Sequence, residues 1–232
     1  MNILAIDTVT PLLSVAAAGP SGTVALEIDS GSSHAERIVE AIDHVVSLSG
    51  FSARETELVC VPSGPGSFTG LRLAWSAGRA IQLASDCRVC PIPPLECYAY
   101  PFREWRGAVL SVIDAKKHRF YIQCFRRGTA INEPLDLDAA RAASLVDEAE
   151  RILITGPDAE FFAEEFSQAL PVSDVTVIPN GGHGMALSYV EFANSGRVQY
   201  TKSIPDHDGP VYVRKSDAEE NYSGHRNIFS GS

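Results

Sequence analysis

The sequence of 232 residues predicts an α/β protein with two lobes, each built on a mixed sheet that is flanked by helices. Three observations lead to this prediction. The first 92 residues follow the order strand, strand, strand, helix, strand, helix, strand, and the second half repeats this plan in a weaker form. A meander followed by helix-linked strands gives a sheet with both antiparallel and parallel pairs. Pro91, Pro93 and Pro94 interrupt the chain between the two halves.

The first half begins with three strands, which we expect at residues 2–7, 12–18 and 23–28. The turn Gly19-Pro20-Ser21-Gly22 joins the second strand to the third, as is typical of a hairpin. A helix then follows, because Ser33 and Glu36 form a capping-box pattern and apolar residues recur at helical spacing. Gly50 is suited to end this helix at its C′ position. A strand at 58–62, a helix to residue 85 and a strand at 87–92 complete this half.

A glycine-rich loop, Gly64-Pro65-Gly66-Ser67-Phe68-Thr69-Gly70-Leu71-Arg72, connects a strand to a helix. Ser67 or Thr69 is placed to cap that helix. Such a loop suits phosphate, because it presents free N–H groups at a helix N-terminus, and it equally suits the close approach of a second backbone. It matches neither a Walker P-loop nor a dinucleotide fingerprint, since no lysine follows and the glycine spacing differs.

The second half starts with a helical stretch from Leu95 to Trp105. We expect strands at 108–113, 120–125, 151–155 and 175–178, a weak strand at 129–135, an extended segment at 212–214, and helices at 138–150, 158–170 and 185–194. The domain boundaries predicted from this pattern are 1–104 for the first lobe, 105–215 for a smaller second lobe, and 216–232 for a polar, disordered tail.

The bulk composition restricts the function classes. The formal net charge of −10 argues against a protein that binds nucleic acid mainly by itself. No apolar run reaches the roughly 20 residues of a membrane span, and the N-terminus lacks the basic region of a secretory signal. The five cysteines follow no disulfide framework, and Cys87 and Cys90 form a C-x-x-C without a second one. These features predict a cytoplasmic protein with reduced thiols.

Four residues are candidates for a nucleotide site at the cleft between the lobes: Asp7, Thr8, Gly66 and Asp114. Carboxylates on facing hairpins would suit Mg²⁺ and phosphate. The alternative is that each aspartate caps the turn after its own strand.

The string GPGSFTGLR resembles the signature of the TsaB (YeaZ) family. Further matches occur in the family's order: the strand Ile3–Thr8, the helix start Ser33–Ile38, the hairpin Ile113–Lys116 and the segment Pro210–Arg214. The resemblance implies the fold of the actin, Hsp70 and sugar-kinase superfamily. It also implies a non-catalytic paralogue of TsaD, the transferase of the machinery that forms N6-threonylcarbamoyladenosine at position 37 of tRNA.

The resemblance implies no catalytic residue and no metal. TsaD carries two histidines four residues apart, and Pro94 and Tyr98 stand at the matching positions here. No cofactor is required, and the cleft would bind Mg-nucleotide weakly at most.

The partners that the resemblance implies are a TsaD-like transferase, a TsaE-like ATPase and, without TsaD, a second copy of this chain. Direct contact with tRNA would be small. The two helices that flank the glycine-rich loop would form the interface, with contacts expected at Ala35, Ile38, Ile42, Leu71, Trp75 and Arg79. A stand-alone nucleotide-binding ATPase or kinase of the same superfamily is the alternative function. A peptidase is less well supported, because the chain shows no metal pair or nucleophile.

Overall fold

The computed structural model describes residues 1–31, 33–147, 150–170, 174–179, 183–196, 209–210 and 213. The tail expected at 216–232 and the extended segment expected at 212–214 lie outside the described residues, apart from Val213. Within the described part of the chain, no helix is both long and apolar enough to cross a membrane.

The first sheet has five strands in the order β3-β2-β1-β4-β5. The central strand β1 pairs antiparallel with β2 and parallel with β4, so the sheet is mixed as predicted. The strands lie close to their expected positions: β1 (Ile3–Asp7), β2 (Leu12–Gly19), β3 (Gly22–Asp29), β4 (Leu58–Pro62) and β5 (Arg88–Ile92).

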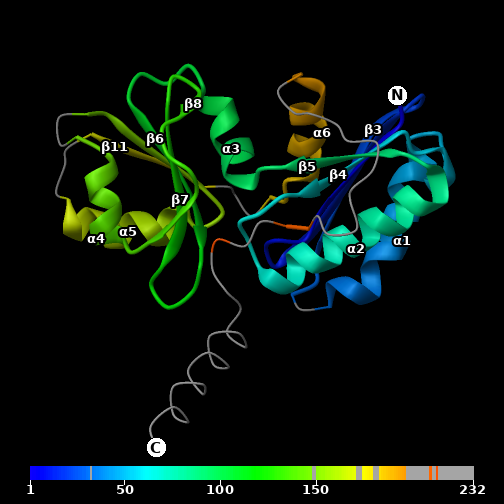
Figure 1. Cartoon of the computed structure of the whole chain (residues 1–232), viewed down its shortest axis with the longest axis horizontal. Coiled ribbons are helices and arrows are strands. Elements are labelled where there is room, and N and C mark those ends of the chain that lie inside the picture. Colours follow the sequence, from blue (N-terminus) through cyan, green and yellow to red (C-terminus); the bar gives the residue numbers. More distant parts are fainter. Residues whose placement is uncertain are drawn as a thin grey trace, which may run out of the picture.

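Helices cover both faces of the first sheet. Along β1, Leu4 and Ile6 pack toward α1 (His34–Leu48) and α2 (Phe68–Ser85). Ile3 and Ala5 face the other way, toward α6 (Ala186–Asn194). Figure 1 shows α1 and α2 together on one side of the strands and α6 on the other. This alternation is the period-2 pattern of a strand that is buried on both faces.

The second sheet has the order β11-β10-β6-β7-β8, and β9 also pairs with β7. One face is covered by α4 (Ala139–Ala142) and α5 (Ala159–Ala169), and the other packs against α3 (Pro94–Ala99). The strands are β6 (Ala108–Asp114), β7 (Phe120–Arg126), β8 (Thr129–Ala130), β9 (Leu135–Leu137), β10 (Ile152–Gly156) and β11 (Val175–Pro179).

Two helices cross between the halves. α3 comes before residue 104 but packs on β6 and β10 of the second sheet. α6 comes from the second half of the chain but packs on β1 and β2 of the first sheet. The predicted boundary at residue 104 therefore separates the strands of the two sheets. Each of these two helices, however, packs on the sheet on the other side of that boundary. One buried cluster, which contains α6, α3 and Ile113 of β6, joins the lobes.

Three local predictions are wrong. Among the described residues of the helix expected at 138–150, only α4 and a 3-10 turn, η3 (Ala143–Leu145), are helical. The single weak strand expected at 129–135 is replaced by the short strands β8 and β9. Ser33 makes no side-chain cap at α1, and a capping box forms instead between Ser52 and Glu55 at η1 (Ala53–Glu55). A further 3-10 turn, η2 (Tyr100–Phe102), follows α3.

Candidate functional site

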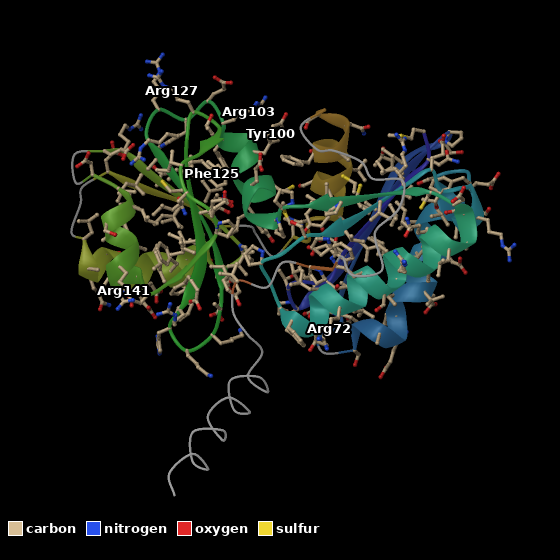
Figure 2. The ribbon with its side chains drawn as sticks, in the orientation of Figure 1. Arg72, Tyr100, Arg103, Phe125, Arg127 and Arg141 are labelled. Carbon is tan, nitrogen blue, oxygen red and sulfur yellow. The ribbon has the colours of Figure 1, made fainter. Side chains whose placement is uncertain are left out.

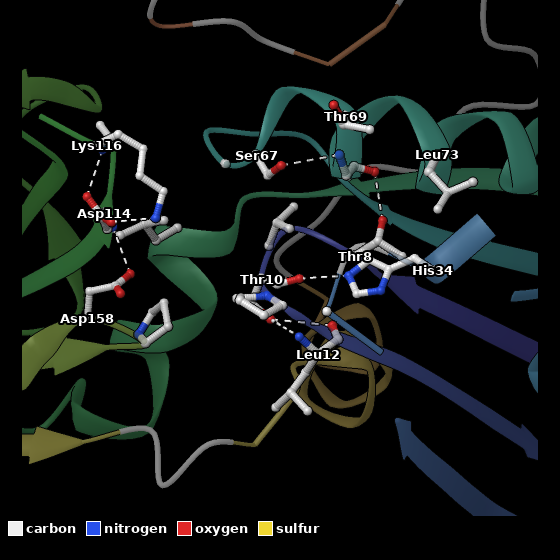
Figure 3. A pocket seen from close by; sticks show the side chains of 18 of the residues that line it. Thr8, Thr10, Leu12, His34, Ser67, Thr69, Leu73, Asp114, Lys116 and Asp158 are labelled. Atoms are coloured by element: carbon white, nitrogen blue, oxygen red, sulfur yellow. Dashed lines mark hydrogen bonds and ion pairs between the residues drawn. The ribbon is translucent and has the colours of Figure 1, made fainter. Parts of the chain in front are cut away.

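A cavity of about 930 Å³ lies between the lobes. Its walls come from the β1–β2 turn, the glycine-rich loop and the first turns of α1 and α2 on one side. The β6–β7 hairpin and the segment after β10 form the other side (Figure 3). Three of the four predicted nucleotide-site residues line it: Thr8, Gly66 and Asp114.

Asp7, the fourth predicted residue, does not line the cavity and is fully buried. Its carboxylate accepts hydrogen bonds from the backbone N–H of Val9 (3.2 Å), the N–H of Met185 (3.2 Å) and the hydroxyl of Tyr189 (3.3 Å). Burial raises the pKa of Asp7 to about 6, and these three donors only partly offset that effect. The carboxylate of Asp7 therefore does not face the cavity in this structure. It caps the turn after its own strand, which was the alternative, and it holds the N-terminus of α6.

The glycine-rich loop packs closely against the end of β1. The Thr8 hydroxyl donates to the carbonyl oxygen of Gly70 at 2.7 Å, and a Cβ on Gly70 would overlap the carbonyl oxygen of Thr8. A Cβ on Gly66 would lie 2.8 Å from Cβ of Val9. Of the two uses expected for this loop, close approach of a second backbone is the one that the contacts confirm.

The loop also starts α2 as the sequence predicts. Ser67 is the N-cap residue, and its hydroxyl oxygen accepts a hydrogen bond from the backbone N–H of Gly70 at 3.4 Å. The first turn of the helix is thus fixed both by its own cap and by the bond from Thr8. The signature string therefore positions α2 relative to β1.

The second lobe contributes two carboxylates and a lysine to the cavity. Asp114 at the end of β6 holds Lys116, with Nζ to Oδ2 at 2.7 Å, and this hydrogen bond raises the pKa of Lys116. Asp158 accepts the backbone N–H of Asp114 at 2.7 Å, and burial raises its pKa. Sequence reasoning missed Asp158, although its signal was present: it follows β10, the parallel neighbour of β6, so both aspartates come from the carboxyl edge of the sheet.

Sequence reasoning also missed His34 as a residue that lines the cavity. Its Nε2 lies 2.9 Å from the carbonyl oxygen of Thr10, which can only accept, so Nε2 carries the proton. Nδ1 then accepts from the hydroxyl of Ser30 at 2.6 Å. His34 thus fixes the start of α1 to the β1–β2 turn.

The cavity is poorly suited to hold a polyphosphate by its own charges. Asp29, Asp114 and Asp158 line it, and Lys116 is already paired with Asp114. Much of the remaining wall is apolar, including Pro11, Leu12, Leu73, Ile113 and Tyr121. Within the described residues, no group of three His, Cys, Asp or Glu side chains is arranged to hold a metal ion. Pro94 and Tyr98, which occupy the positions matched to the TsaD histidines, are buried in α3.

The outer face of the α1–α2 pair is the second candidate site. Of the six predicted contact residues, Ile38, Ile42 and Leu71 are buried in the lobe core, so we correct their assignment to an exposed interface. These three residues belong to the inward stripes of their helices. Ala35 is exposed, while Trp75 and Arg79 are half-buried.

The exposed apolar residues of this pair are different ones. Val39 on α1 is 71% exposed and Leu83 on α2 is 79% exposed. Each lies outside the inward stripe of its helix, and an apolar residue at a solvent-facing helical position was the signal that sequence reasoning overlooked. Ala35, Val39 and Leu48 of α1 and Ala80, Leu83 and Ala84 of α2 are exposed, and we call these residues the outer face of α1–α2.

Comparison with protein families matches residues 28–194 to the model described as TsaD: tRNA N6-adenosine threonylcarbamoyltransferase. The curated relatives include proteins called tRNA threonylcarbamoyladenosine biosynthesis protein TsaB. The one from Escherichia coli is 31% identical over 130 residues, which cover 55% of this chain and 56% of that protein. The one from Haemophilus influenzae is 29% identical over 123 residues, which cover 52% of each. The matched part thus spans about half the length of these relatives.

Solved structures show the same fold. A protein from Pseudomonas aeruginosa described as uncharacterized with similarity to peptidase YEAZ superposes with a TM-score of 0.73 at 22% identity, covering 92% of this chain and 99% of that one. YeaZ from the same organism gives a TM-score of 0.71 at 23% identity, covering 91% and 99%. The architecture expected from the sequence, two lobes with mixed sheets flanked by helices, is therefore confirmed and is the fold of these YeaZ structures.

Proposed function

Because the chain belongs to the TsaD family, in the branch of the TsaB and YeaZ proteins, we propose that it is a non-catalytic subunit of the machinery that forms threonylcarbamoyladenosine in tRNA. Its role in this proposal is to bind a TsaD-like transferase and to hold it in an active arrangement. A TsaE-like ATPase is the third component that we propose.

The outer face of α1–α2 carries the proposal. Val39 and Leu83 leave large apolar side chains in water on two neighbouring helices, on which Ala35, Ala80 and Ala84 are also exposed. Small residues let a partner helix approach closely, and exposed apolar side chains gain free energy when a partner covers them. The opposite face of the sheet is already covered by α6, so a partner that approaches the α1–α2 side of the first lobe meets these helices.

The interior of the protein supports a role without catalysis. Asp7 is committed to α6, Lys116 is paired, and Pro94 and Tyr98 are core residues. The alternative of a stand-alone ATPase or kinase relied on Asp7 and Asp114 facing each other across the cavity, and the carboxylate of Asp7 is turned into the protein interior. The scaffold role therefore has the stronger support.

The test uses the TsaD-like transferase of the same host. Wild-type chain mixed with it should elute from a sizing column as one complex. The double variant Val39→Glu/Leu83→Glu should bind at least about tenfold more weakly, which corresponds to about 1.4 kcal/mol. Both side chains are exposed, so the variant should fold normally by circular dichroism.

A control is Ile131→Glu, which places one glutamate at an exposed apolar side chain of the second lobe. It should assemble like the wild type. Equal binding by the double variant and the wild type would reject the outer face of α1–α2 as the interface. Transfer of threonylcarbamoyl by the lone chain would reject the non-catalytic role.

A further inference from the structure

Arginines from three separate segments gather at the end of the second sheet that is remote from the cavity. Arg103 and Arg106 precede β6, Arg127 follows β7 and Arg151 precedes β10, and all four are exposed. The register explains why they meet: β6 and β10 run parallel and begin at this edge, while antiparallel β7 ends there. Figure 2 shows Arg103 and Arg127 at the same end of the lobe, near Tyr100. We call these four residues the arginine surface.

Aromatic rings and a tight turn hold parts of this surface in place. The guanidinium carbon of Arg103 lies 4.7 Å from the centre of the Tyr100 ring, and that of Arg151 lies 4.8 Å from the centre of the Trp105 ring. Arg103 also packs against the turn after β7, since its Cβ lies 2.8 Å from where a Cβ on Gly128 would be. Guanidinium groups that are already ordered lose less conformational entropy when they bind a ligand.

The charge of this surface is not cancelled within the described residues. Arg151 is paired with Asp174 at 2.9 Å, and the neighbouring Arg126 is paired with Glu150 at 2.7 Å. For Arg103, Arg106 and Arg127, the described part of the chain provides no ion pair, and Glu104 is the carboxylate among residues 100–107. A local excess of positive charge therefore stands on a chain whose net charge is −10.

We propose that the arginine surface binds the phosphate backbone of tRNA, an inference that rests on the proposed function. Guanidinium groups match phosphate oxygens with paired N–H donors, and they also stack on unpaired bases. The surface lies on the second lobe, whereas α1 and α2 belong to the first lobe (Figure 1), so one molecule can hold the transferase and RNA at the same time.

The proposal agrees with the expectation that direct tRNA contact is small. Three arginines without an ion pair among the described residues neutralise only a few phosphates. Each phosphate contact makes the slope of log affinity against log salt more negative by about 0.7 to 0.9. The partner transferase would therefore supply most of the affinity, and this surface would orient the RNA.

The experiment measures the binding of fluorescently labelled host tRNA by anisotropy as the salt concentration is varied. It is done with the chain alone at low salt and with the chain bound to its TsaD-like transferase. The test variant is Arg103→Gln/Arg127→Gln. The control, Arg54→Gln/Arg141→Gln, removes the same charge from exposed arginines elsewhere.

In both settings the test variant should bind tRNA about tenfold more weakly, and its slope of log affinity against log salt should be less negative by about 1.5. The control should change the affinity by less than about twofold. Equal effects of the two variants, or no tRNA binding by either wild-type sample, would overturn the proposal. Weaker assembly of the test variant with the transferase would also overturn it, because the surface would then be a protein interface. If the wild-type chain fails to bind the transferase, the proposed function fails, and the lone-chain measurement still decides this inference.

Discussion

At the scale of single residues, the buried carboxylate of Asp7 ties together parts of the chain that are far apart in sequence. Asp7 is the last residue of β1. Its partner Tyr189 belongs to α6, and its partner Met185 is the residue before that helix. The sequence identifies Asp7 as a special residue at a strand end, but it does not fix the direction of the side chain. That direction depends on α6, which lies about 180 residues further along the chain, and the carboxylate points toward this helix and not into the cavity.

Asp7 should make stability depend on pH in an unusual direction. Its pKa in the folded protein is about 6 against an ordinary value of 3.8, so the unfolded chain loses this proton first as the pH rises. The contribution of Asp7 is therefore greatest below about pH 4 and falls as the pH rises through about 6, by on the order of 3 kcal/mol.

Urea unfolding of the wild type and of Asp7→Asn between these pH values isolates this contribution. The free energy of unfolding of the wild type should fall relative to that of the variant as the pH rises, because Asn cannot ionise. The exposed Asp43→Asn serves as the control and should keep the wild-type profile. Parallel profiles for wild type and Asp7→Asn would show that the carboxyl titrates normally.

At the scale of elements, the sequence predicts regular structure well where the signal is local. The strand β4 and the end of α2 agree with their expected positions, and Gly50 follows the C-cap of α1 with φ of +85°. Prediction fails where tertiary contacts decide. The alanine-rich segment after Asp138 has helical propensity, yet α4 gives way to the 3-10 turn η3, which ends at Leu145. Further along the chain, Glu150 forms an ion pair with Arg126 of β7. The carbonyl of Leu145 accepts from Arg126, a contact that no local pattern predicts.

The two long helices of the first lobe should respond differently to the loss of their N-cap serines. Ser67→Ala removes the acceptor for the Gly70 N–H and should cost about 0.5–1 kcal/mol, at the lower part of the usual range because the bond is 3.4 Å long. Ser33→Ala should cost less than about 0.5 kcal/mol, since Ser33 makes no side-chain cap. Urea unfolding of both variants checks this contrast, and a larger cost at Ser33 would contradict it.

At the scale of the whole molecule, the lobes are coupled by the helices that they exchange. α3 covers the second sheet and α6 covers the first, and one buried cluster includes residues from both halves. Two lobes could be expected from the sequence, because each sheet has its own pattern of strands. The exchange could not, because a helical pattern shows which residues face inward and not which sheet they meet.

The coupling predicts that both lobes unfold in a single transition. The chain has two tryptophans, Trp75 in α2 and Trp105 just before β6. In Trp105→Phe the fluorescence reports the first lobe, and in Trp75→Phe it reports the second. In each variant the urea midpoint from fluorescence should coincide with the midpoint from circular dichroism.

Comparing two signals within one variant removes the effect of the mutations on stability. Such an effect is expected for Trp75→Phe, because the indole N–H donates to the carbonyl of Pro62 at 2.7 Å. A fluorescence midpoint that separates from the circular dichroism midpoint would show that one lobe unfolds without the other.

The late position of α6 in the chain has a consequence for synthesis on the ribosome. The first five strands emerge early, but one side of their sheet keeps Ile3, Ala5 and Cys60 uncovered until residue 194 has left the exit tunnel. The nascent chain therefore exposes an apolar sheet surface during most of translation. We expect chaperones that act at the ribosome to bind it there.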